Sequence, residues 1–373
     1  MRNCSIALAV SLLAFLGGDG VHSPSASAAI INPACGRGIN PVPTCYSDST
    51  LTILFTGDIL LDRGVRYYLE HGGMRRVIPD ETADFLRSAD VVVGNLECPA
   101  TTVQAPAFKR YVFRGDPQWL DSLRAYGFTH LNLANNHSVD QGRQGLRDTR
   151  LNILKAGLTP VGADSTMQAA SIPLPLGKGG VYLLASNRLP LESFAYLPDR
   201  ESVSQEPFDS LLNRVKAIKM ADSIAVVIVN LHWGAEHTLR PLPQQRLEAH
   251  ALIDAGADVI IGHHTHTLQS TETYRGKPIF YSIGNFIFDQ QKPLNTEACI
   301  VRLRITPEKT MADAIPIRID HCAPHICRNS RSSSFNFGND IANGTESACK
   351  ASTTQAHFYA HRCKFLVFSA LYI

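Results

Sequence analysis

The chain has 373 residues, a formal net charge of +2 and 18% charged residues, and 45% of its residues are apolar. This length allows one large domain or two ordinary ones, and the apolar content is enough for a sizeable core. The near-neutral charge offers no basic face for nucleic acid, so we expect no nucleic-acid partner, and the composition is globular rather than disordered.

The N-terminus is typical of an export signal. One arginine precedes an apolar run from Ile6 to Leu16, and Ala26, Ser27 and Ala28 fit an A-x-A cleavage site. The run is shorter than the roughly 20 residues that a membrane span needs. We therefore expect an exported protein, periplasmic or extracellular. The alternative is a protein tethered to the membrane by an uncleaved signal anchor.

Cysteines occur on both sides of the central part of the chain. Cys35 and Cys45 lie in a Pro- and Gly-rich stretch without a core of its own, and because export permits disulfides we expect them to pair. Other cysteines lie in the C-terminal residues 321–373, which show no clear amphipathic pattern. Their connectivity is not readable from sequence, and the absence of a C-x-x-C motif gives no indication of a zinc finger.

Short apolar runs in the central part indicate strands. They are rich in β-branched residues and continuously apolar, as strands buried on both faces are. Helical segments between them complete an alternation that predicts an α/β layered fold. The runs are LTILF (51–55), ADVVVG (89–94), FTHLNLA (128–134), SIAVVIVNL (223–231), ADVIIG (257–262) and KPIFYSIG (277–284).

Two of the helical segments have a readable apolar face. Residues 142–157 and 242–256 both show apolar positions at helical spacing, and each segment ends in a glycine that is a plausible C-terminal stop. The residues expected on the buried faces are Leu146, Ile153 and Leu154 in the first helix and Leu247, Ala251 and Leu252 in the second.

Polar residues of the ligand type follow nearly every predicted strand. In α/β sheets, sites form outside the carboxyl ends of the strands, so these side chains are expected to converge. The densest group is the "HHTH" of residues 263–266, directly after an apolar strand. The residues expected to converge are Asp58, Asn95, Glu97, Asn136, His137, His232, His264 and His266.

Carboxylates, an amide and several imidazoles together form a metal-ligand set. Imidazole with carboxylate suits Zn, Mn or Fe better than Mg or Ca, so we expect one or two divalent metal ions of these kinds. His264 and His266 stand at i and i+2, and in an extended stretch each would reach one of two neighbouring metals, with Glu97 as the bridge. Two metals roughly 3.5–4 Å apart would clamp a tetrahedral phosphorus or carbonyl centre. The expected metal ligands are Asp58, Glu97, Asn136, His232, His264 and His266.

His137 is the expected catalytic acid. It adjoins Asn136 but would point elsewhere, where an imidazole of near-neutral pKa could protonate a leaving group, and Asp140 would orient it. Each site residue also has an ordinary structural explanation, such as a helix N-cap for Asp58 or a satisfied core histidine for His232. For Asn285 a loop residue that binds backbone groups is the preferred interpretation. The recurrence of the same placement after successive strands outweighs these explanations for the cluster as a whole.

Six ordered motifs give the chain a family resemblance. "FTGDILLDR", "NLECPAT", "LANNHSVDQGRQGL", "VNLHWGAEH", "DAGADVIIGHHTHTLQ" and "GKPIFYSIGNFIFDQ" resemble the CapA-type poly-γ-glutamate capsule biosynthesis proteins of the metallophosphatase (calcineurin-like) superfamily. The resemblance runs from about Leu51 to Arg304. It implies a four-layer α/β/β/α sandwich with the metal site at the C-terminal ends of the strands. The superfamily pattern maps onto Asp58, Glu97, Asn136 with His137, His232, and His264 with His266.

The sequence departs from the superfamily pattern in the first motif. Leu60 stands where metallophosphatases usually carry a ligand histidine, so the first metal would have fewer ligands. His237 occupies a position where the CapA-type family commonly has tyrosine, and we expect it beside the site rather than in it.

The resemblance implies an exported, metal-dependent hydrolase of the phosphoesterase type. Its substrate would be either an anionic envelope polymer such as poly-γ-glutamate or a phosphoester, and polymer synthase subunits are possible partners. The alternative is a non-catalytic accessory protein that binds polymer or synthase, which the missing histidine at Leu60 favours. The expected organisation is a signal peptide (1–28), a linker (29–50), a CapA-type domain (51–320) and a divergent Cys- and Ser-rich tail (321–373).

Overall fold

The computed structural model describes residues 50–177, 179–191, 199–327 and 333–338. The predicted signal peptide, the linker and the expected Cys35–Cys45 pair lie outside these residues, as does most of the predicted tail. In the described part of the chain, no helix is long and apolar enough to cross a membrane.

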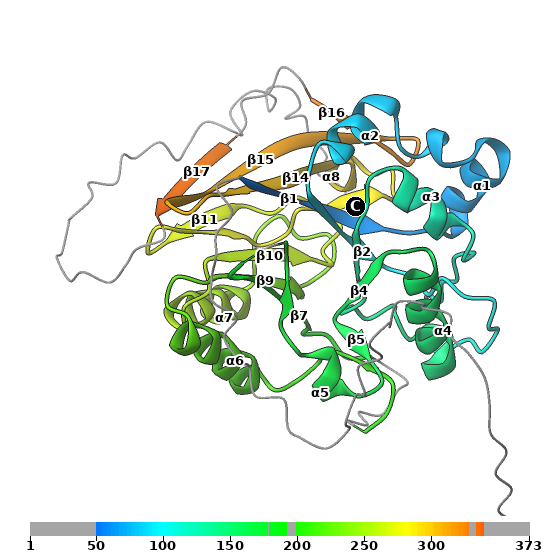
Figure 1. Cartoon of the computed structure of the whole chain (residues 1–373). Helices are drawn as coiled ribbons and strands as arrows, with labels where there is room; N and C mark the ends of the chain where they lie inside the picture. Colours follow the sequence, from blue (N-terminus) through cyan, green and yellow to red (C-terminus); the bar gives the residue numbers. More distant parts are fainter. Residues whose placement is uncertain (1–49, 178, 192–198, 328–332, 339–373) are drawn as a thin grey trace, which may run out of the picture. The chain divides into compact units, whose positions relative to one another are not determined.

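The first sheet combines a parallel half with an antiparallel half (Figure 1). β1 is its central strand, parallel to β2 and antiparallel to β14. The strands in spatial order are β16 (Ala323–Ile326), β15 (Lys309–Asp320), β14 (Glu297–Ile305), β1 (Leu51–Ile59), β2 (Val91–Leu96), β3 (His130–Asn132) and β4 (Thr159–Val161), with β13 (Asn285–Ile287) paired to β1 and β17 (Ser333–Gly338) to β15.

The second sheet is parallel at its centre and antiparallel at both edges. Its strands in spatial order are β11 (Thr271–Tyr274), β12 (Lys277–Phe280), β10 (Val259–His263), β9 (Val226–His232), β7 (Val181–Asn187) and β6 (Leu174–Pro175). A separate short pair is formed by β5 (Ala163–Asp164) and β8 (Ser202–Val203).

Most of the helices connect parallel strands, as crossover connections in α/β folds do. Those of the first half are α1 (Arg63–Gly72), the short 3₁₀ helix η1 (Met74–Arg76), α2 (Asp80–Arg87), α3 (Trp119–Ala125) and α4 (Gly142–Lys155). Those of the second half are α5 (Met167–Ala170), α6 (Phe208–Ala221), α7 (Pro243–Asp254) and α8 (Pro293–Thr296). The exceptions are α5 and α8, which do not connect parallel strands.

Three separate cores show that these elements form four layers. Alternate residues of a strand face opposite sides of a sheet, and β1 follows this rule. Leu54 shares one core with residues of α1 to α4, whereas Phe55 shares a second core with Ile228 of β9. On the other face of β9, Val227 shares a third core with residues of α6 and α7. The layers are therefore α/β/β/α, which is the sandwich of metallophosphatase type that the resemblance implied.

All six predicted strand runs contain a strand, and both predicted helices are present, but two apolar residues were assigned to the wrong helix face. Leu154 of α4 is 50% exposed and Leu247 of α7 is 65% exposed. The buried stripe of α7 includes the polar Gln245, followed by Ala249 and Leu252. The prediction from apolar residues alone therefore placed the buried face of α7 wrongly, because the polar Gln245 occupies one position of that face.

The first sheet continues beyond Asp320, where the domain was expected to end. β16 pairs with β15, and Thr82 on α2 donates a hydrogen bond to the carbonyl of Pro324 at 2.7 Å. Cys322 is 2% exposed and belongs to the core between the first sheet and its helices. The expected domain boundary at residue 320 is therefore too early. The sequence did not indicate β16 because this strand is only four residues long and shows no recognisable alternation.

Candidate metal centre

Strand register brings the polar residues of each sheet to the same level. Asp58 of β1 is aligned with Asn95 of β2 on one side and with Asn285 of β13 on the other. In the second sheet, His232 of β9 is aligned with His263 of β10. All these pairs are parallel. Asp58, Asn95, His232 and His263 are last or next to last in their strands and so lie at the carboxyl edges of the sheets, whereas Asn285 begins β13. Asn95 Nδ2 also donates a hydrogen bond to Asp58 Oδ1 at 2.8 Å.

Two glycines allow the chain to close around these residues. A Cβ on Gly57, directly before Asp58, would lie 2.1 Å from the carbonyl oxygen of Gly284. A Cβ on Gly262, directly before the histidine cluster, would lie 1.9 Å from the carbonyl oxygen of Tyr281. No side chain fits at such distances, so both positions require glycine for close backbone approach.

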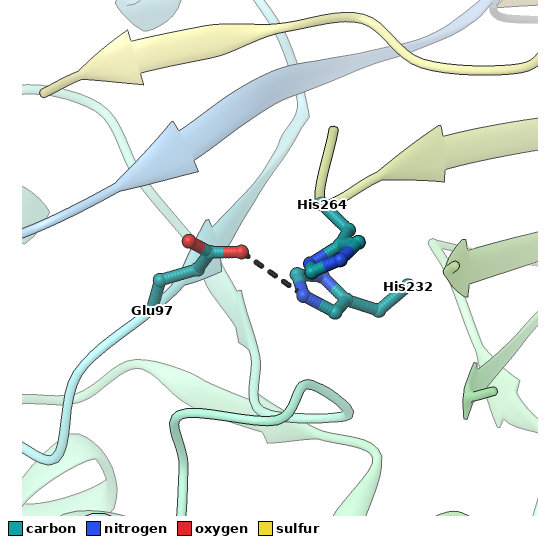
Figure 2. A group of neighbouring side chains, drawn as sticks. All are labelled: Glu97, His232 and His264. Carbon is teal, nitrogen blue, oxygen red and sulfur yellow. Dashed lines mark ion pairs between the residues drawn. The ribbon is translucent and has the colours of Figure 1, made fainter. Parts of the chain in front are cut away.

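A first group of ligand-type atoms joins the two sheets. Figure 2 shows the Glu97 carboxylate directed at His232, with the His264 ring beside it. The distance from Glu97 Oε1 to His232 Nε2 is 3.1 Å, and the ligand atoms of the three residues all lie within 4.8 Å of one another. Asn136 Oδ1 lies 2.9 Å from the same Nε2 atom. All four side chains are buried.

A second group shares Glu97 with the first. It consists of Asp58, Glu97 and His266, whose ligand atoms again lie within 4.8 Å of one another. His266 Nδ1 is 3.2 Å from Asp58 Oδ2, and His266 Nε2 is 3.7 Å from Glu97 Oε2. The structure therefore brings all six predicted ligands together, with Glu97 placed between the two groups. Metal ligation by these residues stays a prediction.

The backbone around His264 and His266 differs from the extended stretch that the i, i+2 spacing suggested. Their φ angles are 89° and 56°, which is the left-handed region. The expectation of an extended backbone was wrong, although the two side chains do enter different groups. A turn rather than a strand separates them, and such conformations in non-glycine residues concentrate at functional sites.

His137 is held beside the first group by a buried polar chain. Its Nδ1 lies 2.9 Å from Asp140 Oδ2, and its ring packs 4.5 Å from that of Phe113. Asp140 Oδ1 pairs with Lys109 Nζ at 2.7 Å, and the same ammonium donates to the carbonyl of Asn136 at 3.0 Å. The contact between His137 and Asp140 agrees with the predicted pairing. Lys109 was missed, because nothing marks it among the residues of its loop.

Two further polar residues support the expected ligands. His263 Nδ1 lies 3.3 Å from Asp58 Oδ1, while its Nε2 lies 2.9 Å from Asn230 Oδ1. Asn285 donates to backbone carbonyls, as expected, but its Oδ1 also lies 3.0 Å from His266 Nδ1. His263 was not among the predicted site residues, although its place in the "HHTH" cluster could have identified it. Outer contacts of this kind fix the orientation of ligand rings.

The two departures from the superfamily pattern lie where expected. Leu60 is fully buried and offers no ligand atom. The His237 ring is 6.1 Å from that of His266, and His237 Nδ1 contacts Asn295 Nδ2 at 3.0 Å. His237 thus lies beside the second group without belonging to it.

The two histidines of the first group are in the form that binds metals. Burial, reinforced by the neighbouring His266, lowers the pKa of His264 to about 3. Burial and then His264 hold the pKa of His232 well below its usual range. Both rings are therefore neutral near pH 7, and a neutral imidazole is the ligand form of histidine.

The second group is a buried cluster of charged side chains that shift one another's pKa values. Burial raises the pKa of Asp58, but hydrogen bonds from His263 and His266 outweigh it and hold this pKa well below its usual range. Burial and the Asp58 carboxylate raise the pKa of Glu97 well above its usual range. Burial lowers the pKa of His266, yet the two carboxylates raise it further, to about 9.

The donor set fits a divalent metal. Glu97 Oε2 is fully buried and accepts no hydrogen bond from the described residues, and the nearest imidazole nitrogen, His266 Nε2, lies 3.7 Å away. Desolvated carboxylates are costly unless they are paired or coordinate a metal. Neutral imidazoles, carboxylates and an amide oxygen at one point suit Mn, Zn or Fe.

Two solved structures are similar to this chain. Vps29 of Chaetomium thermophilum aligns with 80% of this chain and 100% of its own, at 10% identity and a TM-score of 0.34. TT1561 of Thermus thermophilus aligns with 69% of this chain and 99% of its own, at 12% identity and a TM-score of 0.37. Both scores are below 0.5, so the fold assignment rests on the layers described above.

Sequence relatives match the chain at higher identity. The PGA biosynthesis protein CapA of Bacillus subtilis is 33% identical over 78% of this chain and 77% of that protein. The capsule biosynthesis protein CapA of Bacillus anthracis is 31% identical over 74% of this chain and 69% of that protein. The model of the family "Bacterial capsule synthesis protein PGA_cap" matches residues 52–290. The chain therefore belongs to the PGA_cap family of bacterial capsule synthesis proteins and has a metallophosphatase-like fold.

Proposed function

We propose that this protein is a metal-dependent hydrolase of the phosphoesterase type. It would act in making, exporting or attaching an anionic envelope polymer such as poly-γ-glutamate. The observation that carries the proposal is the pair of ligand groups sharing Glu97, with His137 held beside them. The names of the Bacillus relatives support the choice of polymer.

The residues divide the work by their chemistry. Divalent metal ions bound by the two groups would supply Lewis-acid activation of a phosphoryl or carbonyl centre. Glu97 and Asp58 provide the negative charge that holds such ions, while His232 and His264 provide neutral nitrogen ligands. Because all of these side chains are buried, they are oriented before substrate arrives.

His137 is the residue suited to proton transfer. Asp140 contacts its Nδ1, which fixes the ring and leaves Nε2 to donate a proton to a leaving oxygen or nitrogen. The 7% exposure of His137 shows that little solvent reaches the ring. Burial lowers the pKa of His137 below its usual range, and the hydrogen bond to Asp140 opposes this shift in part.

Hydrolysis by the purified protein tests the proposal. Bis(p-nitrophenyl) phosphate and poly-γ-glutamate would be offered after loading with Mn²⁺, Zn²⁺ or Fe²⁺, and metal content would be measured in parallel. We expect metal-dependent turnover that is lost in His232→Ala. His250→Gln is the matched control, since His250 on α7 pairs with Glu272, away from the site, and should behave as wild type. Metal binding without turnover of either substrate would refute the hydrolase.

The second candidate function is a non-catalytic accessory protein for polymer synthesis. Leu60 favours it, because one ligand of the usual set is missing. A relative from Mycobacterium tuberculosis, 30% identical over 65% of this chain, is named a probable polyglutamine synthesis accessory protein. A protein that retains poly-γ-glutamate or a synthase subunit in pull-down experiments but hydrolyses nothing would fit this function.

We also propose that the protein is exported and that the mature chain begins near Ala29. The short apolar run followed by the A-x-A site supports this. N-terminal sequencing of the protein from culture or periplasmic fractions tests it. A membrane fraction in which Met1 is retained would support the signal anchor instead.

A further inference from the structure

We propose that Arg63 binds a carboxylate of the substrate beside the reacting group, and so selects for an anionic chain. The inference rests on the proposed function, since it concerns the substrate of the same site. Arg63 is the first residue of α1, five positions after Asp58, and sequence analysis gave it no role.

Two aromatic rings place Arg63 next to both ends of the site. Its guanidinium carbon lies 5.0 Å from the ring centroid of Phe113 and 5.5 Å from that of Phe288. Phe113 packs 4.5 Å from the ring of His137, and Phe288 packs 4.6 Å from the ring of His266. One phenyl ring therefore separates the guanidinium from the expected proton donor, and another separates it from an expected ligand.

The guanidinium is held in place by a dedicated contact. Asp289 accepts hydrogen bonds from its Nε, at 3.1 Å, and from its Nη2. The same carboxylate accepts from the backbone N–H of Gly64 at 3.1 Å. A Cβ on Gly64 would lie 2.9 Å from the Asp289 Cβ, so glycine permits this close approach. The plane of the guanidinium is thus fixed before a ligand binds.

The backbone of Arg63 is also in an uncommon conformation. Its φ is 50°, in the left-handed region that non-glycine residues rarely adopt. The Asp62 side chain, which accepts from the Arg63 N–H at 2.8 Å, holds this conformation. A strained residue persists only where its surroundings maintain it, and such residues cluster at ligand-binding sites.

One edge of the guanidinium remains open to a ligand. Asp289 uses Nε and Nη2, and within the described part of the chain Nη1 makes no hydrogen bond. The side chain is 35% exposed. Arginine presents its N–H groups in a fork that matches a carboxylate, which gives directed binding that lysine does not.

Arg66, one turn later on α1, shows the contrast. Its Nε donates to Asp62 Oδ1 at 3.0 Å, and its Nη2 donates to the backbone carbonyl of Arg114. No aromatic ring in the described part of the chain links Arg66 to a site histidine. It therefore serves as a matched control: a charged arginine of the same helix with a structural role.

Direct binding of short polymers tests the proposal without requiring turnover. The metal-loaded protein would be titrated with a γ-linked tetraglutamate and with its analogue in which the α-carboxylates are carboxamides. We expect wild type to bind the anionic peptide more tightly, and Arg63→Gln to lose about 10–100-fold in that affinity, as removal of a charged hydrogen-bonded pair does. The carboxamide peptide should bind both proteins alike.

Two variants separate recognition from folding. Arg66→Gln should bind both peptides as wild type does, and Arg63→Lys should recover only part of the affinity because it keeps the charge without the fork. The metal content and the thermal midpoint of Arg63→Gln check that the site is intact. Asp289→Asn removes the carboxylate that orients the Arg63 guanidinium, so this variant should also bind the anionic peptide more weakly.

The outcomes distinguish this inference from the proposed function. Equal affinity of wild type for the two peptides, no binding of either, or an unchanged affinity in Arg63→Gln would overturn it. Charge-selective binding that depends on Arg63, in a protein that hydrolyses neither bis(p-nitrophenyl) phosphate nor poly-γ-glutamate, would support this inference and refute the proposed hydrolase.

Discussion

The carboxyl edges of the two sheets contribute different chemistry to one site. The first sheet supplies oxygen donors, with Asp58 on β1 and Glu97 directly after β2. The second supplies nitrogen donors, with His232 at the end of β9 and His264 after β10. Asp58 lies in β1 where its pairing with β2 is irregular, and the Glu97 N–H donates to the Ile59 carbonyl at 2.8 Å, whereas His264 lies in a bend with left-handed backbone.

Burial acts on these two edges in opposite ways. It raises the pKa of Glu97, because burial and the nearby Asp58 carboxylate disfavour a second negative charge on the oxygen edge. It lowers the pKa values of His232 and His264, so these two ligands of the nitrogen edge are neutral, whereas the two carboxylates raise the pKa of His266 to about 9. A divalent cation resolves both conditions at once, because it balances the carboxylates and binds neutral imidazole. Neither edge would form a metal site without the other.

The largest effect is expected from changing the residue that both groups share. Glu97→Gln removes the charge common to the two groups and should abolish metal binding and turnover together. His264→Ala removes a ligand from one group only, so some metal should remain in the other. Metal analysis of the two variants against wild type measures this. If Glu97→Gln retained its full metal content, Glu97 would not be the shared ligand of the two groups.

The next effect concerns catalysis rather than binding. His137→Ala should leave metal content nearly unchanged and slow turnover by about 10²–10⁴-fold, the usual contribution of a positioned proton donor. The loss should be smaller for a nitrophenyl ester, whose leaving group needs little protonation, than for an alkyl ester. If His137→Ala lost its metal, His137 would instead be a metal ligand and would add a nitrogen donor to the site.

A smaller effect is expected far from the site, at the outer strand of the first sheet. Truncation after Asp320 removes β16 and leaves Thr82 without its acceptor, so unfolding should require about 2–4 kcal/mol less. Truncation after Cys327 keeps β16 and serves as the control. Both should bind metal as the full chain does, and denaturant unfolding with metal analysis checks both points. Equal stability of the two truncated proteins would show that β16 contributes nothing.

The smallest effect is on stability in acid. Burial lowers the pKa of His130, on β3 of the first sheet, to about 4, below the value of about 6.5 in the unfolded chain. The unfolded state then binds more protons between these values, so stability is full above pH 6.5 and falls as pH drops toward 4. We expect a loss of about 1–2 kcal/mol at pH 5 from this group. Urea midpoints of His130→Gln that fall as steeply with pH as those of wild type would contradict it.

Much of the site could be predicted because strand ends are visible in sequence. Each short apolar run ends at a polar residue, and the rule that parallel strands expose their carboxyl ends together made residues as distant as Asp58 and His266 neighbours. The spacing of His137 and Asp140 likewise indicated their contact. These features depend on local pattern plus one topological rule.

The remaining features depend on tertiary contacts that sequence does not show. The turn at His264 and His266 is fixed by neighbours such as Asn285, which lies about twenty positions away. Lys109 carries no local signal, and although Arg63 ends the first family motif, the motif does not show its partner; the contacts of the two residues with Asp140 and Asp289 appear only in the fold. The strands of the antiparallel half of the first sheet were not predicted, because the family motifs end near β14 and give no guide to the residues after it.

Anomalous diffraction from crystals grown with Mn²⁺ or Zn²⁺ tests most directly whether the two sheet edges form one metal centre. The account predicts a peak at coordination distance, about 2.0–2.3 Å, from Glu97, His232 and His264. A second peak between Glu97, Asp58 and His266 would show that both groups are filled. Crystals in saturating metal with no anomalous peak at Glu97 would contradict the account.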